Sequence, residues 1–191
     1  MTRAPLGRRS IRLAGYDYSS SGVYFVTICA FRRMMLFGEI RDAKMIPHAV
    51  GALVVAAWYE LPNRFPTVTL DAFALMPTHL HGIIALHMKN RAEASGTSAE
   101  ADSAPPNSNP TPTLAHVVRT FKSLAYAAVR RRLRRTSPMW QRNYYEHIIR
   151  PGNDLTAIQR YVWENPSRWQ FDRENPQAIL QANPALEPWQ I

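Results

Sequence analysis

The sequence predicts an α+β fold in which an antiparallel sheet is covered by helices. Runs rich in β-branched and aromatic residues, which are typical of strands, alternate with longer runs whose apolar residues recur every three or four positions. Taken in order, these runs read β-α-β-β-α-β-α. Hydrophobic residues make up 46% of the 191 residues, which is enough for one globular core. No apolar run reaches the roughly 18 residues that a membrane span requires.

Three strands and one helix are predicted in the first half of the chain. Residues 23–31 (VYFVTICAF) form the first strand, and their nearly continuous apolar character places it in the middle of the sheet. Residues 48–61 form the first helix, with an apolar stripe at helical spacing. Strands follow at 68–76 and 79–87, and the short Pro77-Thr78 link between them predicts that they pair antiparallel.

A second helix, a fourth strand and a third helix complete the predicted domain. They cover residues 114–135, 143–150 and 155–164 in turn. Residues 89–113 contain no large apolar residue, so we expect a flexible insert there. Two hairpin-like halves, with helices on one face of the antiparallel sheet, correspond to a ferredoxin-like sandwich.

The domain boundaries follow from changes in composition. Residues 1–21 form a basic N-terminal arm, residues 22–166 the main domain, and residues 167–191 a proline-rich C-terminal tail. We expect this tail to pack back on the domain through its large aromatic side chains. These are Trp169, Phe171 and Trp189.

The charge balance favours an anionic partner. The chain carries 23 Lys and Arg residues against 14 Asp and Glu residues, which gives a net charge of +9. Nucleic acid is the first candidate and an anionic membrane surface the second, while a basic surface that serves only solubility is the alternative. Cys29 is the single cysteine, so an internal disulfide and a cysteine-based zinc site are excluded. We therefore expect a reducing, cytoplasmic compartment and association with the nucleoid.

Two basic segments are candidates for contacts with phosphates and bases. The predicted helix at 114–135 carries seven basic residues from position 119 onward and no acid among them. The N-terminal arm combines arginines with a tyrosine-containing loop, which suits a phosphate backbone with stacked bases. In both segments a merely solvated surface is the alternative. The candidate contact residues are Arg8, Arg9, Arg12, Tyr16, Asp17, Tyr18, Arg119, Lys122 and Arg130.

The His79-Leu80-His81 triplet is the first candidate for chemistry. Side chains alternate along a strand, so the two histidines face one side of the sheet and Leu80 faces the other. Two adjacent neutral imidazoles can bind one divalent metal ion. The alternative is that one histidine is a packed, hydrogen-bonded core residue and that the other stands there by chance.

The predicted helix at 155–164 leads to the second candidate group. Tyr161 and Asn165 are four residues apart and therefore lie on one face, beside the apolar stripe that packs on the sheet. The Asn165 side-chain oxygen is a candidate third ligand for Mg²⁺ or Mn²⁺, and the Tyr161 hydroxyl is a candidate nucleophile toward a phosphodiester. A tyrosine that only covers a helix edge is the alternative. The next candidate nucleophiles are Tyr144, Tyr145 and Tyr126.

Four motifs taken together resemble one protein family. The motifs are GVYFVTICAF, MPTHLHGII, WQRNYYEHIIR and RYVWENP. They resemble the REP-associated tyrosine transposases, which are bacterial relatives of the single-tyrosine insertion-sequence transposases in the HUH endonuclease superfamily. The similarity covers most of residues 8–172 apart from the insert. Thr78 departs from the family pattern, which commonly has Asn at that position.

This resemblance implies a site and an activity. It makes His79 and His81 the metal-binding pair and Tyr161 the nucleophile. Asn165 falls where the family places a third, polar metal ligand, although Gln is commoner there in the insertion-sequence relatives. The implied activity is Mg²⁺- or Mn²⁺-dependent cleavage and rejoining of single-stranded DNA at hairpin-forming, REP-like palindromes. It would proceed through a covalent 5′-phosphotyrosine, during DNA transposition and recombination, in a monomer or a homodimer.

Two other classes of function stay open on the residues alone. One is a non-catalytic module that binds single-stranded or hairpin nucleic acid through its basic surface. The other is a metal-dependent hydrolase of a small phosphoester. Against the hydrolase, the sequence offers no obvious carboxylate base near the histidine pair.

Overall fold

The computed structural model describes residues 21–88, 112–150 and 154–178. The predictions for the N-terminal arm, for nearly all of the insert and for the tail from residue 179 onward fall outside these ranges. The candidate contact residues outside them are Arg8, Arg9, Arg12, Tyr16, Asp17 and Tyr18. Within the described residues, no helix combines the length and the apolar character needed to cross a membrane.

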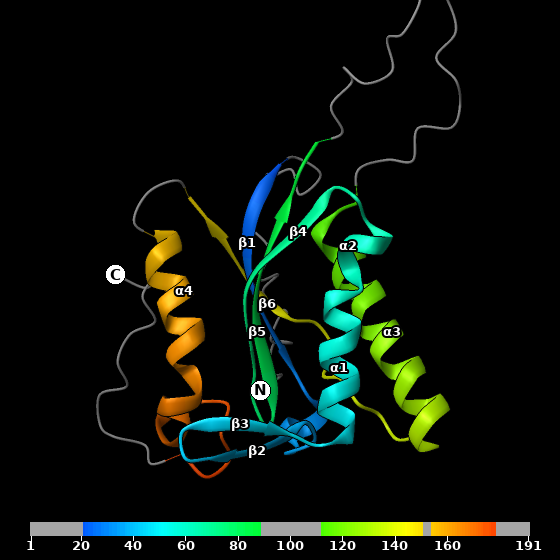
Figure 1. Cartoon of the computed structure of the whole chain (residues 1–191), viewed down its shortest axis with the longest axis vertical. Helices are drawn as coiled ribbons and strands as arrows, with labels where there is room; N and C mark the ends of the chain where they lie inside the picture. The colour runs from blue at the N-terminus through cyan, green and yellow to red at the C-terminus, as the bar shows by residue number, and fades with distance from the viewer. Residues whose placement is uncertain (1–20, 89–111, 151–153, 179–191) are drawn as a thin grey trace, which may run out of the picture.

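Four strands form one antiparallel sheet in the order β4-β5-β1-β6 (Figure 1). The strands are β1 (Gly22–Cys29), β4 (Val68–Leu75), β5 (His79–Leu86) and β6 (Tyr145–Ile149). Each neighbouring pair runs antiparallel, which confirms the α+β class and the predicted pairing of β4 with β5. β1 and β5 occupy the centre, in agreement with their nearly continuous apolar sequences.

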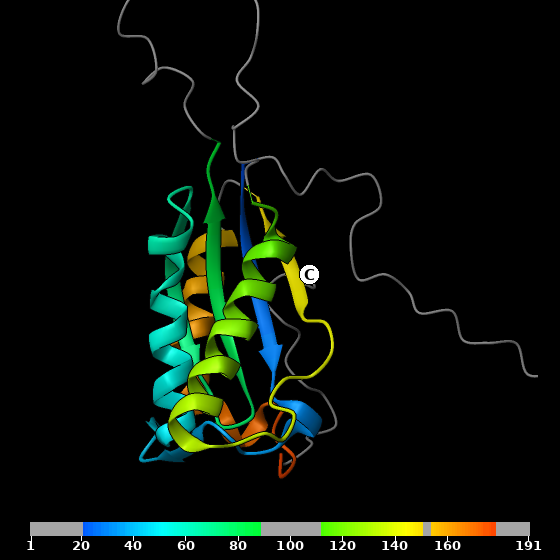
Figure 2. The same ribbon diagram turned by 90° about the vertical axis from the view of Figure 1, so that its right-hand side faces the viewer.

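The long helices cover both faces of this sheet. α1 (Ala49–Tyr59) and α3 (Leu114–Leu133) lie side by side on one face, and α4 (Asp154–Glu164) lies on the other (Figures 1 and 2). The expectation of helices on one face is therefore wrong for α4. The β-α-β-β-α-β unit is complete before α4 begins, and its two long helices already cover one face. Only the second face is left for the apolar stripe of α4.

Shorter elements connect these layers. A two-stranded hairpin of β2 (Gly38–Arg41) and β3 (Lys44–Pro47) packs beside the start of α1. A 3-10 helix precedes it, a short helix follows α1, and a second 3-10 helix follows α4. The bounds of these three helices are η1 (Phe31–Arg33), α2 (Leu61–Arg64) and η3 (Asn165–Phe171).

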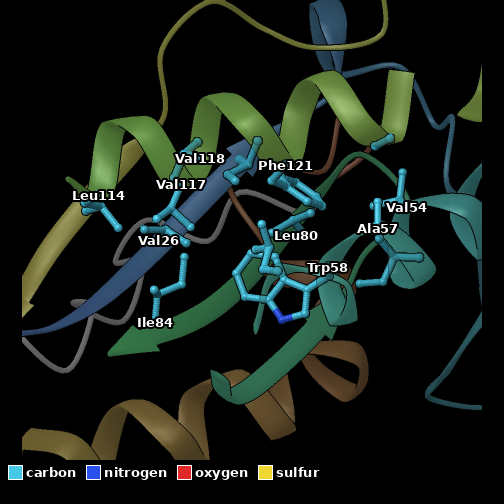
Figure 3. Close-up of a cluster of buried hydrophobic side chains, with 14 of the residues drawn as sticks. Val26, Val54, Ala57, Trp58, Leu80, Ile84, Leu114, Val117, Val118 and Phe121 are labelled. Carbon is cyan, nitrogen blue, oxygen red and sulfur yellow. The ribbon is translucent and has the colours of Figure 1, made fainter. Parts of the chain in front are cut away.

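Strand alternation divides the buried side chains between two clusters. Tyr24 and Val26 of β1 point toward α1 and α3 into the larger cluster, whereas Phe25 points toward α4 into the smaller one. Figure 3 shows the larger cluster around Trp58 of α1. Gly82 of β5 faces this indole, and a Cβ at that position would overlap the ring. The close approach of Trp58 to the sheet therefore requires glycine.

Candidate metal and nucleophile site

β5 carries His79 and His81 on the face that α4 covers. Leu80 belongs to the cluster beneath α1 and α3, whereas Ile83 belongs to the cluster beneath α4. The odd-numbered residues of β5 therefore face α4, as the strand pattern predicts. Both histidines are buried, with 0% and 3% of their surface exposed.

The two imidazoles turn their Nε2 atoms toward each other and their Nδ1 atoms toward threonine hydroxyls. The two Nε2 atoms are 3.0 Å apart. Nδ1 of His81 is hydrogen-bonded to Oγ1 of Thr27 at 2.8 Å, and Nδ1 of His79 to Oγ1 of Thr78 at 3.1 Å. Thr27 is the direct partner of His81 across the β1–β5 pair. Each ring is thus held by a hydrogen bond at Nδ1 and presents its Nε2 to the other ring. This arrangement suits one metal ion shared by the two Nε2 atoms.

A carboxylate that the sequence analysis missed joins this pair. Asp172 Oδ2 lies 3.5 Å from Nε2 of His79, and the ligand atoms of Asp172 and the two histidines all lie within 4.8 Å of one another. Asp172 follows η3, and the nearby Glu174 ties this segment to Arg33 through a 2.7 Å ion pair. The only feature of the sequence that could have indicated Asp172 is its place near a second acid, Glu174, in a strongly basic chain. Asp172 removes the sequence-based objection to a hydrolase, which was the absence of a carboxylate near the histidines.

Asn165, the predicted third ligand, is buried immediately beyond α4. It opens η3, and its side-chain Oδ1 has no hydrogen-bond partner among the described residues. Buried polar atoms are nearly always paired, so this oxygen has the character of a ligand atom for a hard cation. Carboxylate and amide oxygens are ligands that Mg²⁺ and Mn²⁺ accept, and the role of Asn165 as a third ligand beside the histidine pair stays a prediction.

Tyr161 of α4 packs against the histidine pair. Its ring centroid lies 5.3 Å from that of His81 and 6.0 Å from that of Phe25. Phe25 in turn stacks on His81 with a centroid distance of 5.3 Å. The structure therefore brings the candidate nucleophile and the candidate metal pair together in the small cluster between α4 and the sheet.

Burial keeps both histidines neutral. Desolvation, with smaller contributions from the Arg173 and Arg33 charges, lowers the pKa of His79 to about 3. Desolvation, followed by the charges of His79 and Arg173, holds the pKa of His81 well below its ordinary value of 6.5. Neutral imidazole is the form that binds metal ions, so the pair is in its ligand form at neutral pH.

Metal affinity is therefore expected to change little when the pH falls from about 7.5 to about 6. An imidazolium cannot bind a metal ion, so a histidine ligand loses affinity as the pH falls through its pKa. Burial lowers the pKa of His79 to about 3 and holds the pKa of His81 well below its ordinary value of 6.5. Two histidines of ordinary pKa would lose roughly tenfold in affinity over the same range. The charged groups that face the pair are Asp172, Arg173 and Arg33. Calorimetric titration with Mn²⁺ at both pH values measures the effect, and a tenfold loss would contradict the prediction.

α3 lies on one face of the sheet and α4 on the other (Figure 1), and the histidine pair points toward α4. Arg119 and Arg130 are exposed on this helix. The Lys122 ammonium instead donates to the carbonyl oxygens of Gln141 and Asn143, at 3.0 and 2.5 Å, and burial lowers the pKa of Lys122 to about 8. Lys122 thus fastens the segment before β6 to α3. DNA contacts for these three residues stay predictions, and for Lys122 such contacts would compete with the two carbonyls.

Replacing Lys122 with methionine is expected to destabilise the fold by about 1–3 kcal/mol, because two backbone carbonyls lose their donor. Arg119→Met on the same helix is the matched control. Arg119 is exposed, so its replacement should change stability by no more than about 0.5 kcal/mol. Urea unfolding of the two variants measures the difference. Equal stabilities would mean that the Lys122 contacts contribute nothing.

The sequence and the fold were compared with those of known proteins. No known protein-family model matches the chain. Among solved structures, the chain is similar to a REP-associated tyrosine transposase bound to a REP hairpin, with a TM-score of 0.55 and 18% identity. That match covers 85% of this chain and 76% of the other, and it shows a transposase-like fold.

An uncharacterized protein of Haemophilus influenzae is 37% identical over 166 residues, which cover 87% of this chain and 92% of that protein. The chain therefore belongs to the same protein family as this Haemophilus influenzae protein.

Proposed function

We propose that the protein is a metal-dependent endonuclease that cleaves and rejoins single-stranded DNA at hairpin-forming repeats, in DNA transposition or recombination. The observation that carries the proposal is the packing of Tyr161 against His81. It puts a hydroxyl-bearing ring beside two converging imidazole nitrogens. The transposase-like fold supports the reaction class, and the REP hairpin bound by the solved neighbour supports the choice of substrate.

Four side chains would hold the metal ion. The ligand atoms of His79, His81 and Asp172 lie close enough together to bind one ion, and Asn165 offers a buried amide oxygen. Mg²⁺ or Mn²⁺, when bound there, would neutralise charge on a phosphodiester and favour attack on phosphorus. The basic residues of α3 and of the N-terminal arm would bind the phosphates of the hairpin.

Tyr161 performs the covalent step. Its phenolic oxygen attacks phosphorus and loses its proton, the bond between phosphorus and the 3′ oxygen breaks, and that oxygen takes up a proton to leave as a free 3′-OH. The product is a 5′-phosphotyrosine. Attack by a second DNA 3′-OH on this phosphorus forms a new phosphodiester and releases the tyrosine. One phosphoester replaces another in each step, so rejoining needs no ATP.

The test is a labelled adduct assay with the full chain. The probes are oligonucleotide hairpins with randomised single-stranded flanks, labelled at either the 5′ or the 3′ end and incubated with Mn²⁺ or Mg²⁺. A 5′-phosphotyrosine joins the protein to the downstream fragment, so only the 3′ label should migrate with the protein on a denaturing gel. EDTA should prevent the adduct.

Other outcomes of this assay separate the alternatives. Tight hairpin binding without an adduct in either metal, unchanged by EDTA, would identify a non-catalytic binding module. A metal-dependent cut that leaves both labels free of protein would instead indicate attack by water. The position of Asp172 beside His79 favours this hydrolase as the second candidate. It would also hydrolyse bis-p-nitrophenyl phosphate, and this turnover would survive the loss of Tyr161.

A further inference from the structure

We propose that two threonines set the tautomers of the metal-binding histidines, and that they do so in different ways. Thr78 holds His79 permanently with its hydrogen on Nδ1, whereas Thr27 lets His81 change from one tautomer to the other when metal binds. The inference rests on the metal-binding part of the proposed function. Its first test needs neither metal nor DNA.

The contacts of Thr78 determine the tautomer of His79. A threonine hydroxyl has one hydrogen to donate, and a backbone carbonyl can only accept. Thr78 Oγ1 lies 3.0 Å from the carbonyl oxygen of Glu174, so its hydrogen is donated there. The same Oγ1 lies 3.1 Å from Nδ1 of His79 and must accept from it. His79 therefore carries its hydrogen on Nδ1 and presents a lone pair at Nε2.

This lone pair fixes the tautomer of His81 in the absence of metal. The two Nε2 atoms are 3.0 Å apart, a distance at which one of them must donate to the other. His79 Nε2 can only accept, so His81 carries its hydrogen on Nε2. Nδ1 of His81 then accepts from the Thr27 hydroxyl at 2.8 Å. The hydrogen bonds thus run in one direction, from Thr27 through His81, His79 and Thr78 to the Glu174 carbonyl.

Metal binding reverses the first of these bonds and breaks the second, in which His81 Nε2 donates to His79 Nε2. Both Nε2 atoms must be bare to share a cation, so the His81 hydrogen moves from Nε2 to Nδ1. The Thr27 hydroxyl rotates and accepts from Nδ1 instead of donating to it, which a hydroxyl can do without moving its oxygen. The contact of Thr78 with the Glu174 carbonyl stays as it is. Arg33 stabilises that contact through its ion pair with Glu174.

Long-range proton–nitrogen NMR correlation of protein with ¹⁵N-labelled histidine reads each tautomer directly. In metal-free protein we expect the hydrogen on Nδ1 in His79 and on Nε2 in His81. Addition of Mg²⁺, which is diamagnetic, should move the His81 hydrogen to Nδ1 and leave His79 unchanged. A metal-free His79 with its hydrogen on Nε2 would overturn the proposal.

Threonine variants test the same assignment through affinity for Mn²⁺, measured by calorimetry. Thr78→Val removes the acceptor and should weaken binding by about 10- to 100-fold, whereas Thr78→Ser, which keeps the hydroxyl, should restore it. Thr27→Val and Thr27→Ser should behave in the same way. Thr69→Val is the matched control, because Thr69 Oγ1 makes a 2.9 Å hydrogen bond to an exposed histidine, His87, away from the site. Its affinity for Mn²⁺ should equal that of the parent.

The outcomes separate this inference from the proposed function. A parent protein that forms the DNA adduct, together with a folded Thr78→Val variant that binds Mn²⁺ as tightly as the parent, would overturn the inference alone. The expected tautomers and threonine effects, in a protein that never forms an adduct, would overturn the proposed function alone. Thermal unfolding of each variant checks that it is folded, and the serine variants keep the test decisive if a valine variant is not.

Discussion

Replacing Tyr161 with phenylalanine is expected to abolish the covalent adduct while leaving hairpin affinity within about threefold of the parent, a difference below 1 kcal/mol. The substitution removes only the attacking oxygen. The phenylalanine ring keeps the edge-on contacts with His81 and Phe25, so the cluster beneath α4 stays packed. The adduct is measured with the 3′-labelled hairpin, and affinity is measured by fluorescence anisotropy in EDTA.

Tyr145→Phe is the matched control for this experiment. Tyr145 lies on the same face of the sheet, with its ring centroid 6.5 Å from that of Phe25. Its variant should form the adduct at the parental rate. An adduct that persists in Tyr161→Phe and disappears in Tyr145→Phe would transfer the nucleophile role to Tyr145. Persistence in both would turn attention to Tyr144 and Tyr126, although the Tyr126 hydroxyl is engaged with the Thr136 carbonyl.

Replacing His81 with alanine is expected to lower the affinity for Mn²⁺ by more than about 100-fold, because a ligand matters more than the groups that orient it. The adduct should disappear together with the metal. The variant also leaves the buried Thr27 hydroxyl without its partner, which should cost about 1–3 kcal/mol of stability. Calorimetry with Mn²⁺, the adduct assay and urea unfolding measure the three effects.

His87→Ala provides the comparison for this loss. His87 follows the end of β5, is exposed and bonds only to Thr69 among the side-chain contacts described. It should bind Mn²⁺ as the parent does and form the adduct. A folded His81→Ala variant with parental affinity for Mn²⁺ would show that the ion binds elsewhere, and the assignment of the histidine pair would be withdrawn.

Local periodicity predicted the parts of the site that depend on one element at a time. Alternation along a strand put His79 and His81 on one face, and helical spacing put Tyr161 beside the stripe that packs on the sheet. Asp172 could not be found in this way. Its place depends on how the chain runs after η3 and on the contact between Arg33 and Glu174, which are far apart in the sequence.

Two further features needed the fold rather than the pattern. The partnership of Thr27 with His81 depends on the register of β1 against β5, which alternation alone does not determine. The run of basic residues made Lys122 and Arg119 equal candidates for contacts with DNA, but it could not show that two backbone carbonyls already accept hydrogen bonds from the Lys122 ammonium. The same limit explains the wrong expectation for α4, since a stripe shows which side of a helix is buried and not which face of a sheet receives it.

The position of the histidines on a central strand has a consequence for dynamics. β5 pairs with β4 on one side and with β1 on the other, and β1 carries Thr27. Amide hydrogens in such inner strands exchange with solvent only through large-scale opening, whereas edge strands and helix ends exchange through small local fluctuations. The backbone that orients both imidazoles should therefore show some of the slowest hydrogen exchange in the molecule. The two histidines would then need no ordering to bind a metal ion, and their relative geometry should persist for as long as the domain itself stays folded.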